Sequence, residues 1–449
     1  MGEVKLQELK LNEKKNTKQK ILVILALAVP AMIENILQTV VGFVDTLFVA
    51  KLGLHAVTAV GIANTVIAVY IAVFMALGVG TTSLIARNIG AGNLQKARSI
   101  ARQSTFISIV SGLIFGAISL FFSESLLRLM GAEGEVLNNG IIYFQIVAVP
   151  SVFISLMLIF GSILRAAGDT KTPMKVSWWI NIIHIVLDYF LIFGFLGLTG
   201  FGVAGAAWAT VIVRIIGTIA LYYYIKKSPV AFSLKEEASK EDTTSILKLS
   251  TPAAIERLIM RLGQVLYFGL IVKISADTFA AHSIAGNIEM FAYMPGYGLA
   301  IAATTLVGQN VGANRSKEAY QYGMITSWIA VVFMSVIGIL LFFLSPWFAS
   351  WFTTDKTAID MVVTALRIDA FAQPALAIGL VLAGALQGAG DTKSPMFSTA
   401  IGMWVIRIIG VYVLGIQFEM GITGVWLSIA FDLYVRAIFL YYKFKTKVN

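Results

Sequence analysis

The stretch Leu164–Met174, LRAAGDTKTPM, recurs 222 residues later as Leu386–Met396, LQGAGDTKSPM, with eight of eleven positions identical. The same offset relates Pro30 to Pro252. A shared offset over more than a hundred residues indicates an internal duplication of the chain. Further pairs at this offset are Glu34 and Glu256, Asn88 and Asn310, Gly90 and Gly312, and Ala97 and Ala319.

The composition is that of an integral membrane protein. Of 449 residues, 58% are hydrophobic and 13% are charged, whereas soluble domains carry about 25% charged residues. Long apolar runs that contain glycine, proline and aromatic residues indicate membrane-spanning helices and not a β-barrel. We assign the net charge of +10 to basic cytoplasmic loops and expect no nucleic-acid partner. With no cysteine in the chain, disulfides, a thiol nucleophile and a thiolate metal site are excluded.

Twelve apolar segments are long enough to cross a membrane. The loops between them alternate between basic loops and loops poor in lysine and arginine. The basic set belongs to the cytoplasm, so we expect both termini there, in a multi-pass protein of the cell membrane. The predicted spans are 21–50, 57–86, 99–122, 139–163, 174–197, 203–225, 247–273, 278–308, 320–345, 359–386, 396–416 and 421–442.

The longest polar segment divides the spans into two blocks of six. Because six is even, both copies enter the membrane in the same orientation, so the lobes should be related by a pseudo-two-fold axis along the membrane normal. We therefore predict an all-α polytopic membrane protein, with twelve transmembrane helices in two six-helix lobes. The predicted parts are a cytosolic tail (1–20), an N-lobe (21–225), a cytosolic linker (226–246), a C-lobe (247–442) and a second tail (443–449).

The first span, residues 21–50, carries polar residues inside its apolar run. Glu34, Gln38 and Asp45 lie at i, i+4 and i+11, on one narrow helical face. An acid within a membrane helix costs roughly 2.5–3.5 kcal/mol on insertion scales, so it normally faces a cavity or a partner. This stripe is a candidate site for a proton or a cation, with Asp45 as its leading member. The alternative is that the acids make structural hydrogen bonds between packed helices.

The fifth span places Asn181, His184 and Asp188 on one helical face, at i, i+3 and i+7. A second intramembrane acid beside an imidazole suits a proton relay or a small cation site. With Asp45 in the same lobe, the two acids could share one proton through repulsion. The alternative is a core histidine with all its hydrogen bonds satisfied and a capping or interfacial aspartate.

The seventh span duplicates the first, and the differences are informative. Glu256 keeps its place, but Met260 replaces Gln38 and Tyr267 replaces Asp45. The proline and glutamate therefore belong to the fold common to both lobes, and ion chemistry is expected mainly in the N-lobe.

The seventh span also adds Arg257 and Arg261, and the eighth span contributes Glu289. Two arginines and two acids suggest neutralisation within the lobe, and a buried charge network that holds helices together is the structural alternative. The candidate substrate or cavity residues are Glu34, Gln38, Glu256, Arg257, Arg261, Tyr267 and Glu289.

Two further features bear on mechanism. Pro30 interrupts the first span and serves as a candidate hinge. The many aromatic residues and methionines would suit a cavity for bulky, lipophilic organic cations. No metalloprotease motif, nucleotide-binding loop or nucleophile elbow is present, so an enzyme is not expected.

These residues resemble the multidrug and toxic compound extrusion (MATE) family over almost the whole chain. The family's proline and aspartate fifteen residues apart match Pro30 and Asp45. Its Asn-x-x-x-Asp pair matches at Asp188, with His184 where asparagine is usual. Thr210 matches the family's threonine in the sixth span.

By this resemblance Asp45, Asp188 and Thr210 belong to the proton or cation site of the N-lobe, where Asn181 supplies the missing amide. The family's sodium-coupled branch carries acids at positions that align here with Met260 and Leu376. The resemblance therefore favours the proton-coupled branch, which includes DNA-damage-inducible protein F.

The resemblance implies a secondary active multidrug exporter that antiports organic, mostly cationic compounds against protons by alternating access. It also implies a monomer in the lipid bilayer, with no cofactor and no metal besides the coupling ion. The alternatives are a sodium-coupled exporter of the same family, a related flippase for lipid-linked sugars, and a non-transporting membrane receptor or enzyme.

Overall fold

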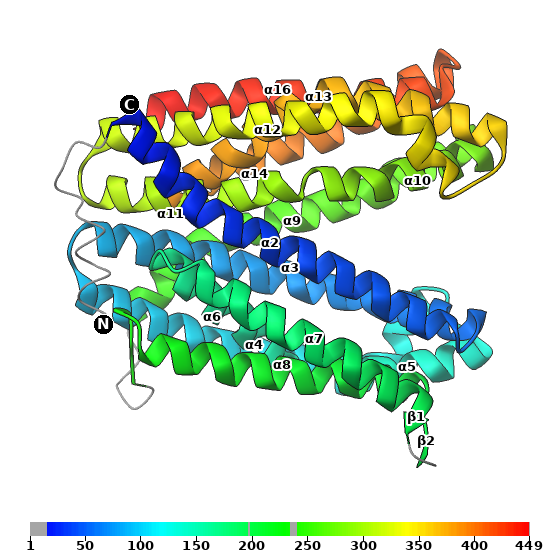
Figure 1. Ribbon diagram of the computed structural model, residues 1–449, viewed down its shortest axis with the longest axis horizontal. Coiled ribbons are helices and arrows are strands. Elements are labelled where there is room, and N and C mark those ends of the chain that lie inside the picture. The colour runs from blue at the N-terminus through cyan, green and yellow to red at the C-terminus, as the bar shows by residue number, and fades with distance from the viewer. Residues whose placement is uncertain (1–15, 196–197, 234–239, 449) are drawn as a thin grey trace. The chain divides into compact units, whose positions relative to one another are not determined.

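The computed structural model describes residues 16–195, 198–233 and 240–448, so predictions that fall on residues 1–15, 196–197, 234–239 and 449 lie outside the described residues. The described chain is helical apart from one short hairpin (Figure 1). Its elements are α2 (Thr17–Ala50), α3 (Leu54–Gly90), α4 (Leu94–Leu129), α5 (Gly134–Ala148), α6 (Ser151–Ala166), α7 (Lys171–Phe193), β1 (Gly194–Phe195), β2 (Leu198–Thr199), α8 (Val203–Lys226), α9 (Lys240–Ile274), α10 (Ala276–Ala292), α11 (Met294–Gly312), α12 (Ser316–Ser350), α13 (Lys356–Gly388), α14 (Lys393–Ala400), the π-helix η1 (Ile401–Arg407), α15 (Ile408–Gly410), the π-helix η2 (Val411–Gln417) and α16 (Gly421–Val448).

Each predicted span corresponds to a helical segment, and the all-helical two-lobe prediction is confirmed. Two spans are bent: α5 and α6 meet at 48°, and α10 and α11 at 44°. Pro150 precedes α6 and Pro295 lies in the first turn of α11. Proline donates no backbone hydrogen bond, which explains why the predicted spans 139–163 and 278–308 are each interrupted.

Several helix ends differ from the predicted ends of the spans. The fifth span ends at Phe193, because Gly194 adopts φ 87° and opens the β1–β2 hairpin. α9 already begins at Lys240, inside the segment predicted as a linker. Within the described residues hydropathy alone identifies up to eleven spans and omits α9, because Glu256, Arg257 and Arg261 lie in the middle of that helix.

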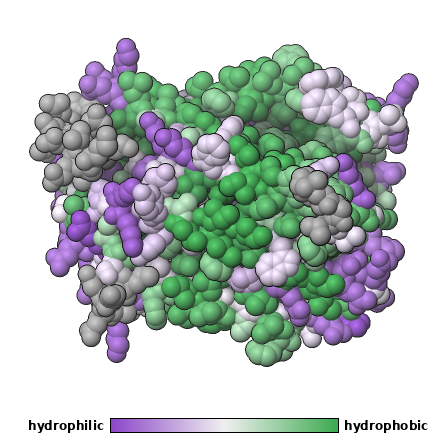
Figure 2. Space-filling view, turned by 60° about the horizontal axis from the view of Figure 1, so that its bottom comes forward, coloured by the Kyte–Doolittle hydropathy of each residue, from purple (hydrophilic) through white to green (hydrophobic). Residues whose placement is uncertain are grey.

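The outer surface of the helices is apolar. Large hydrophobic side chains such as Phe121, Phe343 and Phe431 are strongly exposed. Figure 2 shows hydrophobic residues covering the middle of the visible face, with hydrophilic residues gathered toward the helix ends. This distribution is the one expected of a multi-pass membrane protein.

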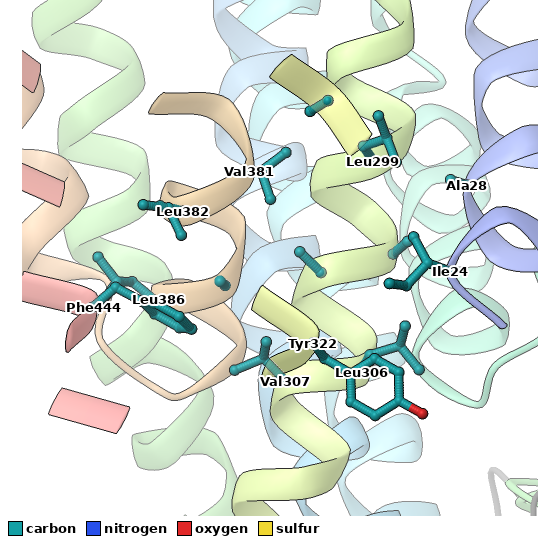
Figure 3. Packing of buried hydrophobic residues seen from close by; sticks show 14 of the residues in the cluster. Ile24, Ala28, Leu299, Leu306, Val307, Tyr322, Val381, Leu382, Leu386 and Phe444 are labelled. Atoms are coloured by element: carbon teal, nitrogen blue, oxygen red, sulfur yellow. The ribbon is translucent and has the colours of Figure 1, made fainter. Parts of the chain in front are cut away.

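The chain forms two compact units. Of the described residues, unit 1 contains those within 33–85 and 93–254, and unit 2 contains 16–32, 86–92 and 255–448. The first half of α2 thus packs within unit 2, where Ile24 and Ala28 join a core formed by α11, α12, α13 and α16 (Figure 3). The first part of α9 packs within unit 1. The two exchanged segments are related by the 222-residue offset of the duplication.

A reciprocal glycine contact within unit 2 carries the two-fold relation. Gly90 lies against the backbone of Gln309, and Gly312 lies against the backbone of Arg87, so that neither glycine has room for a side chain. Both pairs are related by the offset of 222. When one residue touches a second, and their duplicates make the same contact with the roles exchanged, the arrangement is the one that a two-fold axis produces.

One buried ion pair holds the first part of α2 in unit 2, and another holds the first part of α9 in unit 1. In unit 2 the Lys20 ammonium, 4% exposed, lies 2.5 Å from the Glu318 carboxylate of α12. In unit 1 the Asp242 carboxylate, 1% exposed, lies 2.7 Å from the Lys96 ammonium of α4. Lys20 is the duplicate of Asp242, and Lys96 is the duplicate of Glu318. The duplication has kept the pair and reversed its polarity.

This inversion predicts a charge-swap rescue. Lys20→Glu and Glu318→Lys, made singly, should each lower the free energy of unfolding by about 3 kcal/mol, because each leaves like charges facing one another at a buried site. The double variant should recover most of this loss, as measured by thermal unfolding in detergent. Reversal of the exposed Glu124–Arg128 pair is the control and should change stability by less than about 1 kcal/mol. Additive losses in the Lys20/Glu318 double variant would contradict the pairing.

Candidate functional site

The N-lobe residues singled out on the fifth and sixth spans come together in unit 1. On α7, His184 Nε2 lies 3.4 Å from Asp188 Oδ2 and 3.3 Å from Thr210 Oγ1 of α8. The Thr210 hydroxyl donates to the backbone oxygen of Ala206 at 3.0 Å, so toward His184 its oxygen accepts. The geometry therefore favours the tautomer in which His184 carries the proton on Nε2 and offers it to the Thr210 oxygen.

The carboxylates of this cluster are not satisfied by hydrogen bonds. Asp188 is fully buried, and neither of its oxygens has a hydrogen-bond partner among the described residues. The same holds for Oδ1 of Asp45 and for the amide nitrogen of Asn181. Asp45 and Asp188 interact electrostatically with each other. Buried polar atoms without partners are costly, so a group that brings protons or positive charge fits this arrangement.

Arg214 is the cationic member of the cluster, and the sequence analysis missed it. It follows Thr210 by one turn of α8 and interacts electrostatically with Asp45 and His184. Arg214 thus faces Asp45, and the cluster as a whole holds two acids and this guanidinium group, which leaves one negative charge for a proton or another cation. Its signal in the sequence is an arginine in the middle of an apolar span, four residues after a candidate site residue.

A neighbouring tyrosine completes the surroundings. Tyr143 of α5 interacts electrostatically with Asp45, Asp188 and Arg214. Its hydroxyl donates to the Asn64 side-chain oxygen of α3 at 3.4 Å. The cluster therefore draws on five helices of unit 1: α2, α3, α5, α7 and α8.

Glu34 is separate from this cluster. Its carboxylate accepts hydrogen bonds from Arg165 at 3.2 Å and from Ser177 at 3.4 Å. Gln38 lies on α2 with an exposed side chain. The structure therefore does not bring Glu34 and Gln38 together with Asp45, although all three share a helical face.

The duplicate of Glu34 makes the duplicate contacts. Glu256 accepts hydrogen bonds from Gln387 at 3.5 Å and from Thr399 at 3.1 Å, and both partners are offset by 222 from those of Glu34. The acid is retained because it links the first helix of each repeat to the GDTK region. There Asp169 and Asp391 accept hydrogen bonds from Thr172 and Ser394, respectively.

Unit 2 contains a cavity of about 590 Å³. Four of the candidate substrate or cavity residues line it: Glu256, Arg261, Tyr267 and Glu289. Arg257, on the same helix, is not among the lining residues. Aromatic rings from three helices share the wall, including Phe268, Tyr293 and Tyr297. A mixed aromatic and charged wall of this size suits a drug-sized organic ligand.

A second charge network borders this cavity, and the sequence analysis missed it as well. The Asp432 carboxylate of α16 accepts hydrogen bonds from Arg407 at 2.9 Å and from Arg436 at 2.5 Å and 2.8 Å. Asp432 and Arg436 are the duplicates of Thr210 and Arg214. The C-lobe therefore carries more buried charge than we expected, in the region that mirrors the N-lobe cluster.

The two-lobed helical fold, with acids and arginines buried in its spans, defines a polytopic membrane transporter. The family model described as MatE matches residues 30–190 and 252–413, and the chain belongs to this family. The family is one of transporters and not of enzymes. Both repeats are matched, in agreement with the duplication.

Individual relatives agree over nearly the whole length. The chain is 34% identical over 420 residues to the probable multidrug resistance protein NorM of Thermotoga maritima, covering 92% of this chain and 90% of the relative. A solved transporter of the MOP superfamily from Pyrococcus furiosus has a TM-score of 0.89 at 26% identity, covering 97% and 99% of the two chains. An outward-facing multidrug resistance MATE transporter gives the same TM-score and identity, with 95% of each chain covered.

The role of Arg214 can be tested by a double-variant cycle. Arg214→Gln should destabilise the protein by about 3 kcal/mol, because it leaves buried acids without their cation. Adding Asp45→Asn should recover about 1–2 kcal/mol by removing one of those acids. Thermal unfolding in detergent measures both effects. Arg128→Gln, on the exposed end of α4, is the control. Strictly additive losses would show that Arg214 does not compensate Asp45.

Proposed function

We propose that this protein exports lipophilic organic compounds, mostly cations, in exchange for protons by alternating access. The observation that carries the proposal is the interaction of Asp45 with Asp188 inside the membrane-spanning helices, where Arg214 acts on Asp45 and the Asp188 oxygens have no hydrogen-bond partner among the described residues. One negative charge in excess is the condition for binding one proton or one cationic group. The relatives named above, which are described as multidrug resistance proteins, support the class of substrate.

The side chains available to bind a coupling ion favour protons over sodium. In the N-lobe His184 presents an imidazole nitrogen to Asp188, and nitrogen is a poorer ligand for a hard cation than an amide oxygen. In the C-lobe, Met260 and Leu376 line the cavity with apolar side chains. Neither position offers an oxygen, so a sodium site there would lack its acids.

The coupling follows from the charge of the cluster. A proton on Asp45 or Asp188 removes the repulsion between the two acids and balances Arg214. This changes the polar contacts of the second half of α2. Pro30 separates that half from the first half, which the Lys20 ion pair holds in place. Because proline leaves one backbone carbonyl of α2 without its donor, bending near Pro30 is the least costly response of the helix. A coupled exporter needs only that protons and substrate favour different conformations.

Flux measurements test this mechanism directly. With the protein in vesicles, a pH gradient alone should drive ethidium movement and a sodium gradient alone should not. Asp45→Asn should reduce proton-driven flux at least tenfold, because the neutral amide cannot exchange a proton. Asp277→Asn, an exposed acid in the first turn of α10, is the matched control and should retain the flux. Flux driven by sodium alone, or undiminished in Asp45→Asn, would refute proton antiport through this residue.

We also propose that the protein acts as a monomer with both termini in the cytoplasm. The alternation of basic loops supports this orientation. Because the chain has no cysteine, single substitutions can be labelled without background. Lys18→Cys and Lys445→Cys should resist a membrane-impermeant thiol reagent in intact cells and react after permeabilisation. Glu133→Cys, between α4 and α5, should react in intact cells. The opposite labelling pattern would invert the orientation.

A further inference from the structure

A basic pocket opens in unit 1 where α4 begins and α8 ends. Its volume is about 640 Å³. Arg98 and Arg102 line it from the first turns of α4, and Lys226 lines it from the last turn of α8. Tyr222 and Phe232 add aromatic walls. No acid is among its lining residues in the described part of the chain. Because like charges that face one pocket repel each other, the pocket suits an anion.

The contacts of two of these cations leave them available to a ligand. Arg98 Nε donates to the backbone oxygen of Pro229 at 2.9 Å, which holds the guanidinium group in place and leaves its two terminal nitrogens as donors. The Lys226 ammonium lies 5.0 Å from the centre of the Tyr222 ring, and this ring stacks on Phe160 of α6 at 5.6 Å. Among the described residues, neither Arg98 nor Lys226 forms an ion pair.

The acid that touches the pocket wall already has a cation outside the pocket. Ser99 lines the pocket and donates its hydroxyl to Asp242 of α9 at 2.5 Å. The Lys96 ammonium, which is not part of the lining, lies 2.7 Å from the same carboxylate. Glu241 lies 3.8 Å from Lys96 and is strongly exposed. Lys96 therefore takes up the charge of Asp242.

The other repeat fills the duplicate position with apolar side chains. The residues 222 positions after the three pocket cations are Tyr320, Met324 and Val448. Tyr320 stacks at 5.7 Å on Phe444, which is the duplicate of Tyr222. All four pack in the core of unit 2. The fold common to both repeats therefore does not require cations at these positions.

The helical faces that carry the cations continue into exposed apolar surface. Phe106 and Leu113 follow Arg102 by four and eleven residues, and both are strongly exposed. On α8 the strongly exposed Ile219 precedes Lys226 by seven residues. These spacings place each apolar side chain on the same face of its helix as the cation. An anionic group in the pocket, with apolar chains along these faces, is the arrangement of a bound phospholipid.

We propose that this pocket binds the phosphate headgroup of an anionic phospholipid. The terminal nitrogens of Arg98 match the oxygens of a phosphate, and Lys226 adds a point charge. In the orientation proposed above the pocket lies at the cytoplasmic leaflet, where basic pockets between membrane helices bind anionic headgroups. It shares no lining residue with the cavity of unit 2. Lipid binding here is therefore separate from the transported compound and from the coupling ion.

Native mass spectrometry of the full-length protein in detergent tests the site. The probes are dioleoyl phosphatidylglycerol and dioleoyl phosphatidylcholine, which has no net charge. The wild-type protein should retain phosphatidylglycerol in preference. Arg98→Gln with Lys226→Gln should weaken its binding at least tenfold, since each cation near an anionic lipid contributes about fivefold. The matched control, Lys443→Gln with Lys445→Gln, removes two exposed cations from the end of α16 and should keep the preference.

Three results would overturn the proposal. The first is equal binding of the two lipids by the wild-type protein, and the second is equal loss in the pocket variant and in the control. The third is inorganic phosphate that displaces phosphatidylglycerol and raises the unfolding temperature of the lipid-free protein, which would make this a site for a free phosphate compound. If the double variant does not fold, Lys226→Val, the residue of the other repeat, decides by itself. It should weaken binding about fivefold, and an unchanged affinity would refute the site.

Discussion

A charge inside an apolar helix bundle must have a partner, and this constraint organises the structure. A buried carboxylate or guanidinium loses the solvation of water and regains it only from close, well-aligned groups. Lys20 meets Glu318, Asp242 meets Lys96, and Asp432 meets two arginines. The Lys20–Glu318 and Lys96–Asp242 pairs join helices that are distant in the sequence. The constraint is left unmet at Asp45 and Asp188, which is where the proposed antiport mechanism places its proton.

The duplication shows this constraint clearly, because the same buried position can be compared in the two repeats. The Glu34 and Glu256 contacts are the same in both repeats, so they belong to the architecture. The Lys20 and Asp242 pairs keep the contact but exchange the signs. An ion pair can be inverted only if both partners change, so the pairing, and not either charge, is what the fold requires. The repeats differ without compensation at Asp45 and Tyr267, and this is the difference to which the proposed mechanism gives a role in proton coupling.

The sequence predicted what depends on periodicity along one helix. The spans, the internal repeat and the common face of His184 and Asp188 all follow from residue spacing. It did not reveal that Arg214 acts on Asp45, because this interaction joins different helices and depends on their packing. Spacing was also misleading for Glu34: it shares a face with Asp45, yet Arg165 and Ser177 already satisfy it. The bends at Pro150 and Pro295 arise because proline donates no backbone hydrogen bond, which hydropathy does not measure.

α2 connects these observations into a mechanism. Its first half is held in unit 2 by Lys20 and by the packing of Ile24 and Ala28, whereas its second half carries Asp45 in unit 1. Pro30 lies just before the change from one unit to the other. In the proposed mechanism, a helix that is fixed at one end and bears a titratable acid beyond its proline converts a change of charge into a change of direction. Glu34 already accepts hydrogen bonds from Arg165 and Ser177. In the proposed mechanism the change therefore stays close to Pro30. α9 has the equivalent proline and glutamate, Pro252 and Glu256, but Tyr267 stands at the position of Asp45. In the proposed mechanism α9 therefore has no acid that could take up the proton at this position.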